Sequence, residues 1–139
     1  MIQYFCYGSN MSKQRMIDRG VVFYDMKSAK LENYELKFNK ISKNQGAVAN
    51  IVYMPGSIVE GILYSVEDIS ILDRYEGVKG GHYKRVLLNV DNVAAWTYIC
   101  ENPQYIQEGL KPKQEYLNLL LEGKEYLSDE YYQNIKNVL

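Results

Sequence analysis

The chain has 139 residues, 47% of them hydrophobic, which is enough for one domain with a core and too little for two. Its 16 basic and 17 acidic residues nearly cancel, and this balance argues against electrostatic binding of nucleic acid or of an anionic membrane. We therefore expect a single domain over residues 1–139, with specific binding of a small molecule left open.

The N-terminal segment, residues 2–10, is an apolar and aromatic run that ends abruptly at Gly8-Ser9-Asn10. This pattern predicts a strand that turns into a helix over Ser12–Arg19, with Ser9 or Asn10 as the helix cap. Because Gly8 has no side chain to block a ligand, the exposed N–H groups of the turn could bind an anion, and a carboxylate suits the single glycine better than a nucleotide phosphate. The same residues are typical of a plain strand-to-helix turn, so both alternatives stand at this point.

The next stretch is rich in β-branched and aromatic side chains, which predicts four strands. Two of them fall within Val21–Phe38. Two more, Ala47–Met54 and Ile58–Tyr64, flank Pro55-Gly56-Ser57, a sequence typical of a hairpin turn. The hydrophobic period then changes, which predicts a helix over Val66–Glu76.

That helix has a recognisable start and end in the sequence. Ser65 with Asp68 resembles a capping box, and Gly77 follows the last helical residue. The helix is therefore expected to present Glu76 in its last turn.

Strand patterns return at His82–Val90 and Val93–Cys100, joined by a tight turn at Asp91-Asn92. Two amphipathic helices are predicted after a proline-bracketed loop, over Gln114–Leu121 and Ser128–Val138. About seven short strands with few helices favour an α+β fold in which a mixed, mostly antiparallel sheet closes into a small β-barrel flanked by short helices.

Cys6 and Cys100 lie in apolar runs without the paired spacing of a zinc site or the density of a disulfide framework. We expect both to be buried thiols. His82 is the only histidine, and it is expected in a loop or at a strand start, so no metal site is predicted. The sequence shows neither a membrane-spanning stretch nor a signal-peptide pattern, and we expect a cytoplasmic protein.

Glu76 lies at the unfavourable end of its predicted helix. Carboxylates are disfavoured near a helix C-terminus, and the flanking Tyr75 and Val78 indicate partial burial, so both effects raise the pKa of Glu76. A glutamate with a raised pKa can take a proton from an amine and return it later, as general acid–base catalysis requires. The alternative is a solvated glutamate paired with Arg74 or a lysine. Asp73 is expected to be an exposed helix charge.

Taken together, these motifs resemble the gamma-glutamylcyclotransferase-like family over most of the chain. The matching blocks are Tyr7-Gly8-Ser9-Asn10-Met11, Gly46–Ile51, Glu60–Tyr64, Leu72–Val78 with Tyr83, and Asn102–Tyr105. The first and fourth blocks are the most specific, and their order and spacing make coincidence improbable.

The resemblance implies a compact β-barrel flanked by helices, with Glu76 as the general acid–base residue and no cofactor. It further implies that the glycine loop cradles the glutamyl group, that Tyr105 contacts the substrate and that two further tyrosines form the pocket wall. The implied substrate-binding residues are Tyr7, Gly8, Ser9, Asn10, Tyr83, Tyr98 and Tyr105.

The reaction implied by the resemblance is intramolecular. The α-amine of a γ-linked glutamyl group attacks its own γ-carbonyl, and 5-oxoproline and a free amine are released. The leaving amine is left open between an amino acid, the side chain of lysine and an antibiotic amine, and the sequence does not indicate an oligomeric state.

Two alternatives of other classes stay open at the level of sequence. The fold could be a non-catalytic binding module for a glutamyl-like metabolite. It could also be an interaction protein whose docking surface is formed by tyrosines near the C-terminus, namely Tyr116, Tyr126, Tyr131 and Tyr132.

Overall fold

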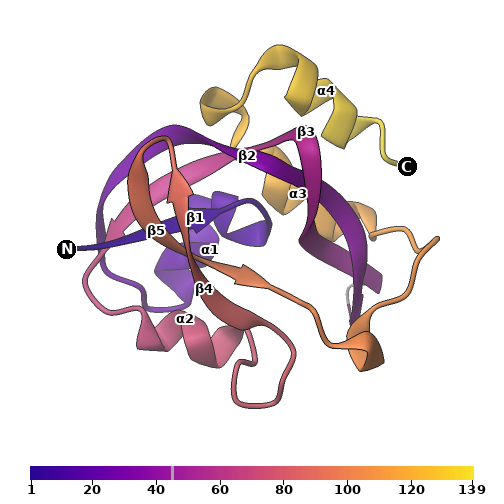
Figure 1. Ribbon diagram of the computed structural model, residues 1–139, viewed down its shortest axis with the longest axis horizontal. Helices are drawn as coiled ribbons and strands as arrows, with labels where there is room; N and C mark the ends of the chain where they lie inside the picture. The colour runs from indigo at the N-terminus through magenta and orange to yellow at the C-terminus, as the bar shows by residue number, and fades with distance from the viewer. Residues whose placement is uncertain (45) are drawn as a thin grey trace.

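The computed structural model describes residues 1–44 and 46–139, and its centre is one five-stranded sheet in the order β2-β3-β1-β5-β4. Neighbouring strands pair antiparallel except for β1 and β5, which run parallel (Figure 1). The strands are β1 (Ile2–Cys6), β2 (Phe23–Ser42), β3 (Gly46–Val66), β4 (Lys84–Val90) and β5 (Val93–Ile99).

The second and third strands are much longer than predicted. β2 has 20 residues and β3 has 21, so the prediction of four short strands in this region is wrong. Pro55-Gly56-Ser57 does not form a hairpin turn but bulges from β3 near Asn33, where the register of the β2–β3 ladder shifts. Asn33 and Gly56 adopt positive φ angles of 68° and 88°, and Asn33 Oδ1 accepts a hydrogen bond of 3.1 Å from the Gly56 N–H. A bulge and a turn need the same residue types, because both require left-handed backbone.

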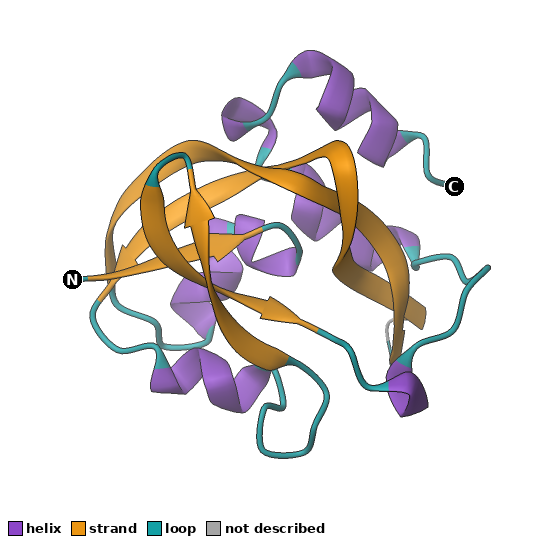
Figure 2. Ribbon diagram, in the orientation of Figure 1, coloured by secondary structure: helices purple, strands orange, loops and turns teal. Residues whose placement is uncertain are grey.

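The fold is α+β with a mixed, mostly antiparallel sheet, as predicted, but the sheet is not closed, and the predicted barrel is wrong. The long β2–β3 ladder carries three register irregularities. In Figure 2 this ladder bends over β1, which gives the sheet strong curvature. Curvature therefore comes from two long strands rather than from additional short ones, and β2 and β4 remain as the two edges.

Each predicted helix is present among the described residues, and short 3₁₀ turns separate some of them from the sheet. The α-helices are α1 (Lys13–Asp18), α2 (Ser70–Tyr75), α3 (Gln114–Leu121) and α4 (Asp129–Lys136). The 3₁₀ turns are η1 (Ser9–Met11), η2 (Pro103–Tyr105) and η3 (Lys124–Tyr126).

Two predicted helix caps are wrong. Because η1 intervenes after β1, α1 is capped by Ser12, whose Oγ accepts a hydrogen bond from the Arg15 N–H at 3.2 Å, and not by Ser9 or Asn10. The capping box before α2 does not form, because Ser65 is still paired in β3. Asp68 Oδ1 instead accepts the N–H of Ser70 at 2.9 Å.

The central strand β1 is buried on both faces, as strand alternation requires. Tyr4 and Cys6 pack into one apolar cluster with α3 and α4, whereas Phe5 and Tyr7 pack into a second cluster with β2, β3 and β5. The two cysteines are buried, as predicted. Three of the four C-terminal tyrosines pack half-buried against the first cluster and Tyr116 lies inside it, which gives them a structural role. Among the helices described, none is long and apolar enough to cross a membrane.

Candidate active site

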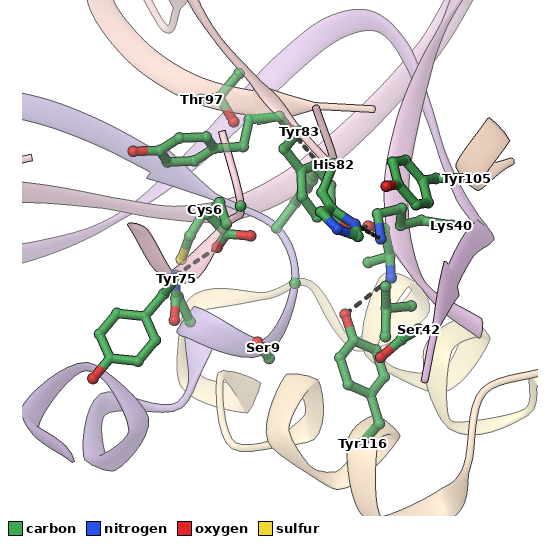
Figure 3. Close-up of a pocket in the computed structure, with 18 of the residues that line it drawn as sticks. Cys6, Ser9, Lys40, Ser42, Tyr75, His82, Tyr83, Thr97, Tyr105 and Tyr116 are labelled. Atoms are coloured by element: carbon green, nitrogen blue, oxygen red, sulfur yellow. Dashed lines mark hydrogen bonds between the residues drawn. The ribbon is translucent and has the colours of Figure 1, made fainter. Parts of the chain in front are cut away.

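A cavity of about 650 Å³ opens where β1 ends, between η1, the C-terminus of α2 and the start of β4 (Figure 3). The structure brings all eight residues singled out in the sequence to the lining of this cavity. They are Tyr7, Gly8, Ser9, Asn10, Glu76, Tyr83, Tyr98 and Tyr105.

Glu76 is the C-cap of α2, and Gly77 follows it with φ 65°, the left-handed geometry that ends a helix. Its side chain is 17% exposed, and Oε1 lies 3.3 Å from Asn10 Nδ2 and 3.7 Å from Arg19 Nη1. Within the described chain, Oε2 has no hydrogen-bond partner, so one carboxylate oxygen is available to a ligand. The alternative of a solvated glutamate paired with Arg74 or a lysine is wrong, because Glu76 is mostly buried and its ion-pair partner is Arg19, at the end of α1.

Burial raises the pKa of Glu76, and nearby positive charges act against that rise. Arg19, Arg15 and Lys40 each lower the pKa, as does the hydrogen bond from Asn10. The net effect is a raised pKa, which agrees in direction with the sequence prediction, but the dominant cause is loss of solvent.

Asn10 is a scaffold residue beneath the carboxylate. Only 3% exposed, it donates from Nδ2 to the Tyr4 hydroxyl oxygen at 2.8 Å as well as to Glu76. Its Oδ1 accepts from Arg19 at 3.0 Å, and its backbone carbonyl accepts from the Tyr64 hydroxyl at 2.7 Å. Every polar atom of the Asn10 side chain is thus engaged, and the residue fixes Glu76 and Arg19 relative to each other.

Gly8 lies where β1 turns into η1, and the cavity wall is close on its open side. A Cβ at this position would come within 3.3 Å of both Ala49 Cβ and the Tyr116 hydroxyl oxygen. That hydroxyl accepts the Ala49 N–H at 2.9 Å, so it is held in place. Ser9 starts η1, and the first N–H groups of such a turn have no acceptor within the turn, which leaves them able to bind an anion.

Three tyrosines of the cavity wall, Tyr7, Tyr83 and Tyr98, use their hydroxyl groups within the protein. Tyr7 donates to the backbone carbonyl of Tyr98, and Tyr83 donates to that of Ala49 at 2.6 Å. Burial raises the pKa of each of these three tyrosines, which keeps the hydroxyls protonated. Their aromatic faces, rather than their hydroxyls, are what the wall offers to a ligand.

Tyr98 also ties α2 to the sheet. Its hydroxyl donates to Asp73 Oδ1 at 2.7 Å, and Arg85 Nη1 of β4 lies 3.2 Å from Asp73 Oδ2. Asp73 was expected to be an exposed charge, and that expectation is wrong, because the sheet supplies two partners that are distant in sequence. The helix that carries Glu76 is therefore anchored one turn before the carboxylate.

Part of the cavity lining is positively charged, and the residues that form it were not predicted from the sequence. Arg15 of α1 and Arg19, the C-cap of that helix, line the cavity near Glu76, and Lys40 of β2 lines it beside His82. His82 lies in the loop before β4, as expected, and its ring stacks on Tyr105 with centroids 4.0 Å apart. Lys40 follows the strand region predicted to end at Phe38, and its polar neighbours Asn39 and Ser42 give no sign in the sequence that this lysine is buried.

Comparison with known proteins gives consistent matches. Residues 4–125 match the family described as "Gamma-glutamyl cyclotransferase, AIG2-like". The gamma-glutamylcyclotransferase of Bos taurus is 29% identical over 97% of this chain and 77% of its own length, and that of Homo sapiens is 27% identical over the same shares.

Solved structures show the same fold over nearly the whole chain. A structure titled gamma-glutamyl cyclotransferase superimposes with a TM-score of 0.87 at 27% identity, covering 99% of this chain and 88% of the other. YkqA from Bacillus subtilis gives 0.84 at 28% identity, covering 97% of this chain and 52% of its own.

Proposed function

Because the chain belongs to the gamma-glutamyl cyclotransferase, AIG2-like family, which is a family of enzymes, we propose that it releases 5-oxoproline and a free amine from a small γ-glutamyl amide. The observation that carries the proposal is the Glu76 carboxylate. It is mostly buried, held by Asn10 and Arg19 through one oxygen, and open to a cavity of metabolite size through the other. This arrangement supports an enzyme over a passive binding module, because a binder gains nothing from a carboxylate with a raised pKa.

In the proposed reaction, Glu76 first takes a proton from the substrate's α-ammonium group, which is mostly protonated at neutral pH. The freed nitrogen attacks the γ-carbonyl carbon, and a five-membered ring closes. The bond from that carbon to the leaving nitrogen then breaks as Glu76 returns its proton to that nitrogen. The ring nitrogen also loses a second proton, which the released amine takes up, so atoms and charges balance without a cofactor: both protons that leave the α-nitrogen end on the amine, the first of them carried by Glu76.

The start of η1 has a place in this proposal as an anion site. Ser9 and Asn10 line the same cavity as Glu76, and their backbone N–H groups can bind either the α-carboxylate or the oxyanion that forms on the γ-carbonyl. The tyrosine-lined wall would hold the glutamyl chain folded, with its amine near its own carbonyl, which is the main requirement of a ring closure.

The test is a substrate panel with a matched pair of variants. Purified protein is incubated with γ-glutamyl amino acids, γ-glutamyl-ε-lysine and γ-glutamylated aminoglycosides, and 5-oxoproline is measured by mass spectrometry. Glu76→Gln keeps the shape and removes proton transfer, so kcat should fall by about 100-fold or more. Glu67→Gln, an exposed glutamate outside the cavity, should leave kcat unchanged. Full activity in Glu76→Gln, or no 5-oxoproline from any substrate, would refute the proposal.

A further inference from the structure

Lys40 is a buried cation without a carboxylate partner. The residue is 4% exposed, and among the described residues no aspartate or glutamate oxygen lies within 4.0 Å of its Nζ. Lysine is rarely buried unless its charge is paired, because removing an ammonium group from water is costly. The charge of Lys40 is instead directed toward the cavity, which it lines.

The neighbours of Lys40 hold the ammonium group but do not neutralise it. Nζ donates to the Ile41 carbonyl oxygen at 2.7 Å and lies 3.1 Å from His82 Nδ1. An ammonium group can only donate, so His82 Nδ1 must accept, and the histidine is neutral with its proton on Nε2. Two of the three N–H bonds of Lys40 are thus used on protein atoms, and the third remains for a ligand. The rings of Tyr83 and Tyr105 lie 5.5 and 5.1 Å from Nζ and add cation–π attraction.

Lys40 faces the cavity from the side opposite the acid–base group. In Figure 3, Cys6 and Tyr75 lie on one side of the cavity, whereas Lys40, Ser42 and Tyr105 lie on the other. Glu76 Oε1 lies 3.7 Å from Arg19 Nη1, and the Arg19 guanidinium lies over the Tyr75 ring, 4.8 Å from its centroid, which places the carboxylate on the Tyr75 side of the cavity. A ligand whose amine contacts Glu76 therefore has to extend across the cavity to reach Lys40.

Building on the proposed function, we infer that Lys40, oriented by His82, binds a carboxylate carried by the leaving amine and so selects γ-glutamyl amino acids over γ-glutamyl derivatives of uncharged or cationic amines. The α-carboxylate of the glutamyl group is a poorer candidate for Lys40. It sits on the same carbon as the α-amine, so it stays beside Glu76 and the start of η1 when the substrate folds for ring closure. Only the substituent of the leaving nitrogen extends toward Lys40.

The test compares two substrates that differ in one charge, γ-glutamylalanine and γ-glutamylalaninamide, with the wild-type protein and with Lys40→Met. Methionine is close to lysine in length but carries no charge. Lys30→Met makes the same substitution at an exposed position of the same strand and serves as the control. A hydrogen bond to a charged group predicts that wild-type kcat/KM is about 10- to 100-fold higher for the acid than for the amide. Lys40→Met should lose this preference and Lys30→Met should keep it.

Equal kcat/KM for the two substrates in the wild-type protein would overturn the inference whether or not the variant folds. A preference that persists in folded Lys40→Met would also overturn it. If no substrate yields 5-oxoproline, the proposed function fails, and calorimetry of the same two ligands then decides the role of Lys40 separately. Binding of γ-glutamylalanine at least about tenfold tighter than that of its amide, with the difference lost in Lys40→Met, would support the carboxylate site, and equal binding would refute it.

Discussion

Replacing Arg19 with methionine tests how the protein sets the pKa of Glu76, the proposed acid–base residue. Arg19 Nη1 lies 3.7 Å from Glu76 Oε1, and the two side chains are 14% and 17% exposed. Arg19 favours the ionised carboxylate, whereas burial favours the protonated acid. Removing the guanidinium therefore raises the pKa of Glu76 further.

The size of the effect follows from the separation of the two charges. At 3.7 Å, Coulomb's law gives an attraction of about 1 kcal/mol in bulk water and about 4 kcal/mol at an effective dielectric constant near 20. The pair is mostly buried, so its value lies between these limits. Because about 1.4 kcal/mol corresponds to a factor of ten, the ionised fraction of Glu76 at a given acidic pH should fall at least about fivefold.

The assay is the pH dependence of kcat/KM for 5-oxoproline release. In the proposed role of general base, Glu76 must be ionised in the free enzyme, so activity rises with pH through the pKa of Glu76, and the acidic limb of the pH profile reports that pKa. In Arg19→Met the limb should move to higher pH. Arg74→Met, at an exposed position of α2, is the matched control and should leave the limb in place. The electrostatic reasoning is refuted if the acidic limb of the kcat/KM profile of Arg19→Met does not shift, or shifts to lower pH.

Three further outcomes follow from the same contacts. Glu76→Gln should raise Tm at pH 7, because a carboxyl group with a raised pKa stabilises the fold only while it is protonated. This contribution to stability is complete below the unfolded pKa of about 4.3 and is lost as pH rises through the pKa in the folded protein, so melting curves near pH 4 should show no gain in Tm. Gly8→Ala should destabilise the protein by about 1 kcal/mol through its contact with the Tyr116 hydroxyl, and urea unfolding should show a smaller loss when Tyr116→Phe is already present. Tyr98→Phe should cost about 1 to 2 kcal/mol by removing the hydrogen bond to Asp73, and an unchanged urea midpoint would contradict that role.

The features that local sequence controls were predictable. The turn at Asp91-Asn92 forms with positive φ at both residues, 50° and 66°, as expected for a tight hairpin. The end of α2 is equally local, since Gly77 fixes the helix C-terminus and thereby the position of Glu76. The strand, glycine and helix order at the N-terminus is likewise set within a few residues, and it places Gly8 at the cavity.

The features that were missed depend on pairing between distant segments. Whether Pro55-Gly56-Ser57 turns or bulges is decided by how β3 continues along β2, and the residue that receives the Gly56 N–H is Asn33, far away in sequence. The prediction of a closed barrel is wrong for the same reason. Long-range pairing gives two long strands, β2 and β3, where the sequence indicated several short ones. The partners of Glu76 and Asp73 also come from other elements, which no local pattern identifies.

The charges around the cavity fit one protonation state of the proposed substrate better than another. Arg15, Arg19 and Lys40 contribute three positive charges from buried or half-buried positions, against the single negative charge of Glu76. A γ-glutamyl amino acid has two carboxylates and one ammonium group, and it becomes a dianion once the ammonium is deprotonated. In the proposed reaction, transfer of that proton to Glu76 neutralises the one carboxylate among the described residues that line the cavity, which leaves three cations to stabilise the dianion. The arrangement thus favours the reactive form of the substrate, with Arg15 and Arg19 near the glutamyl end and Lys40 near the leaving end.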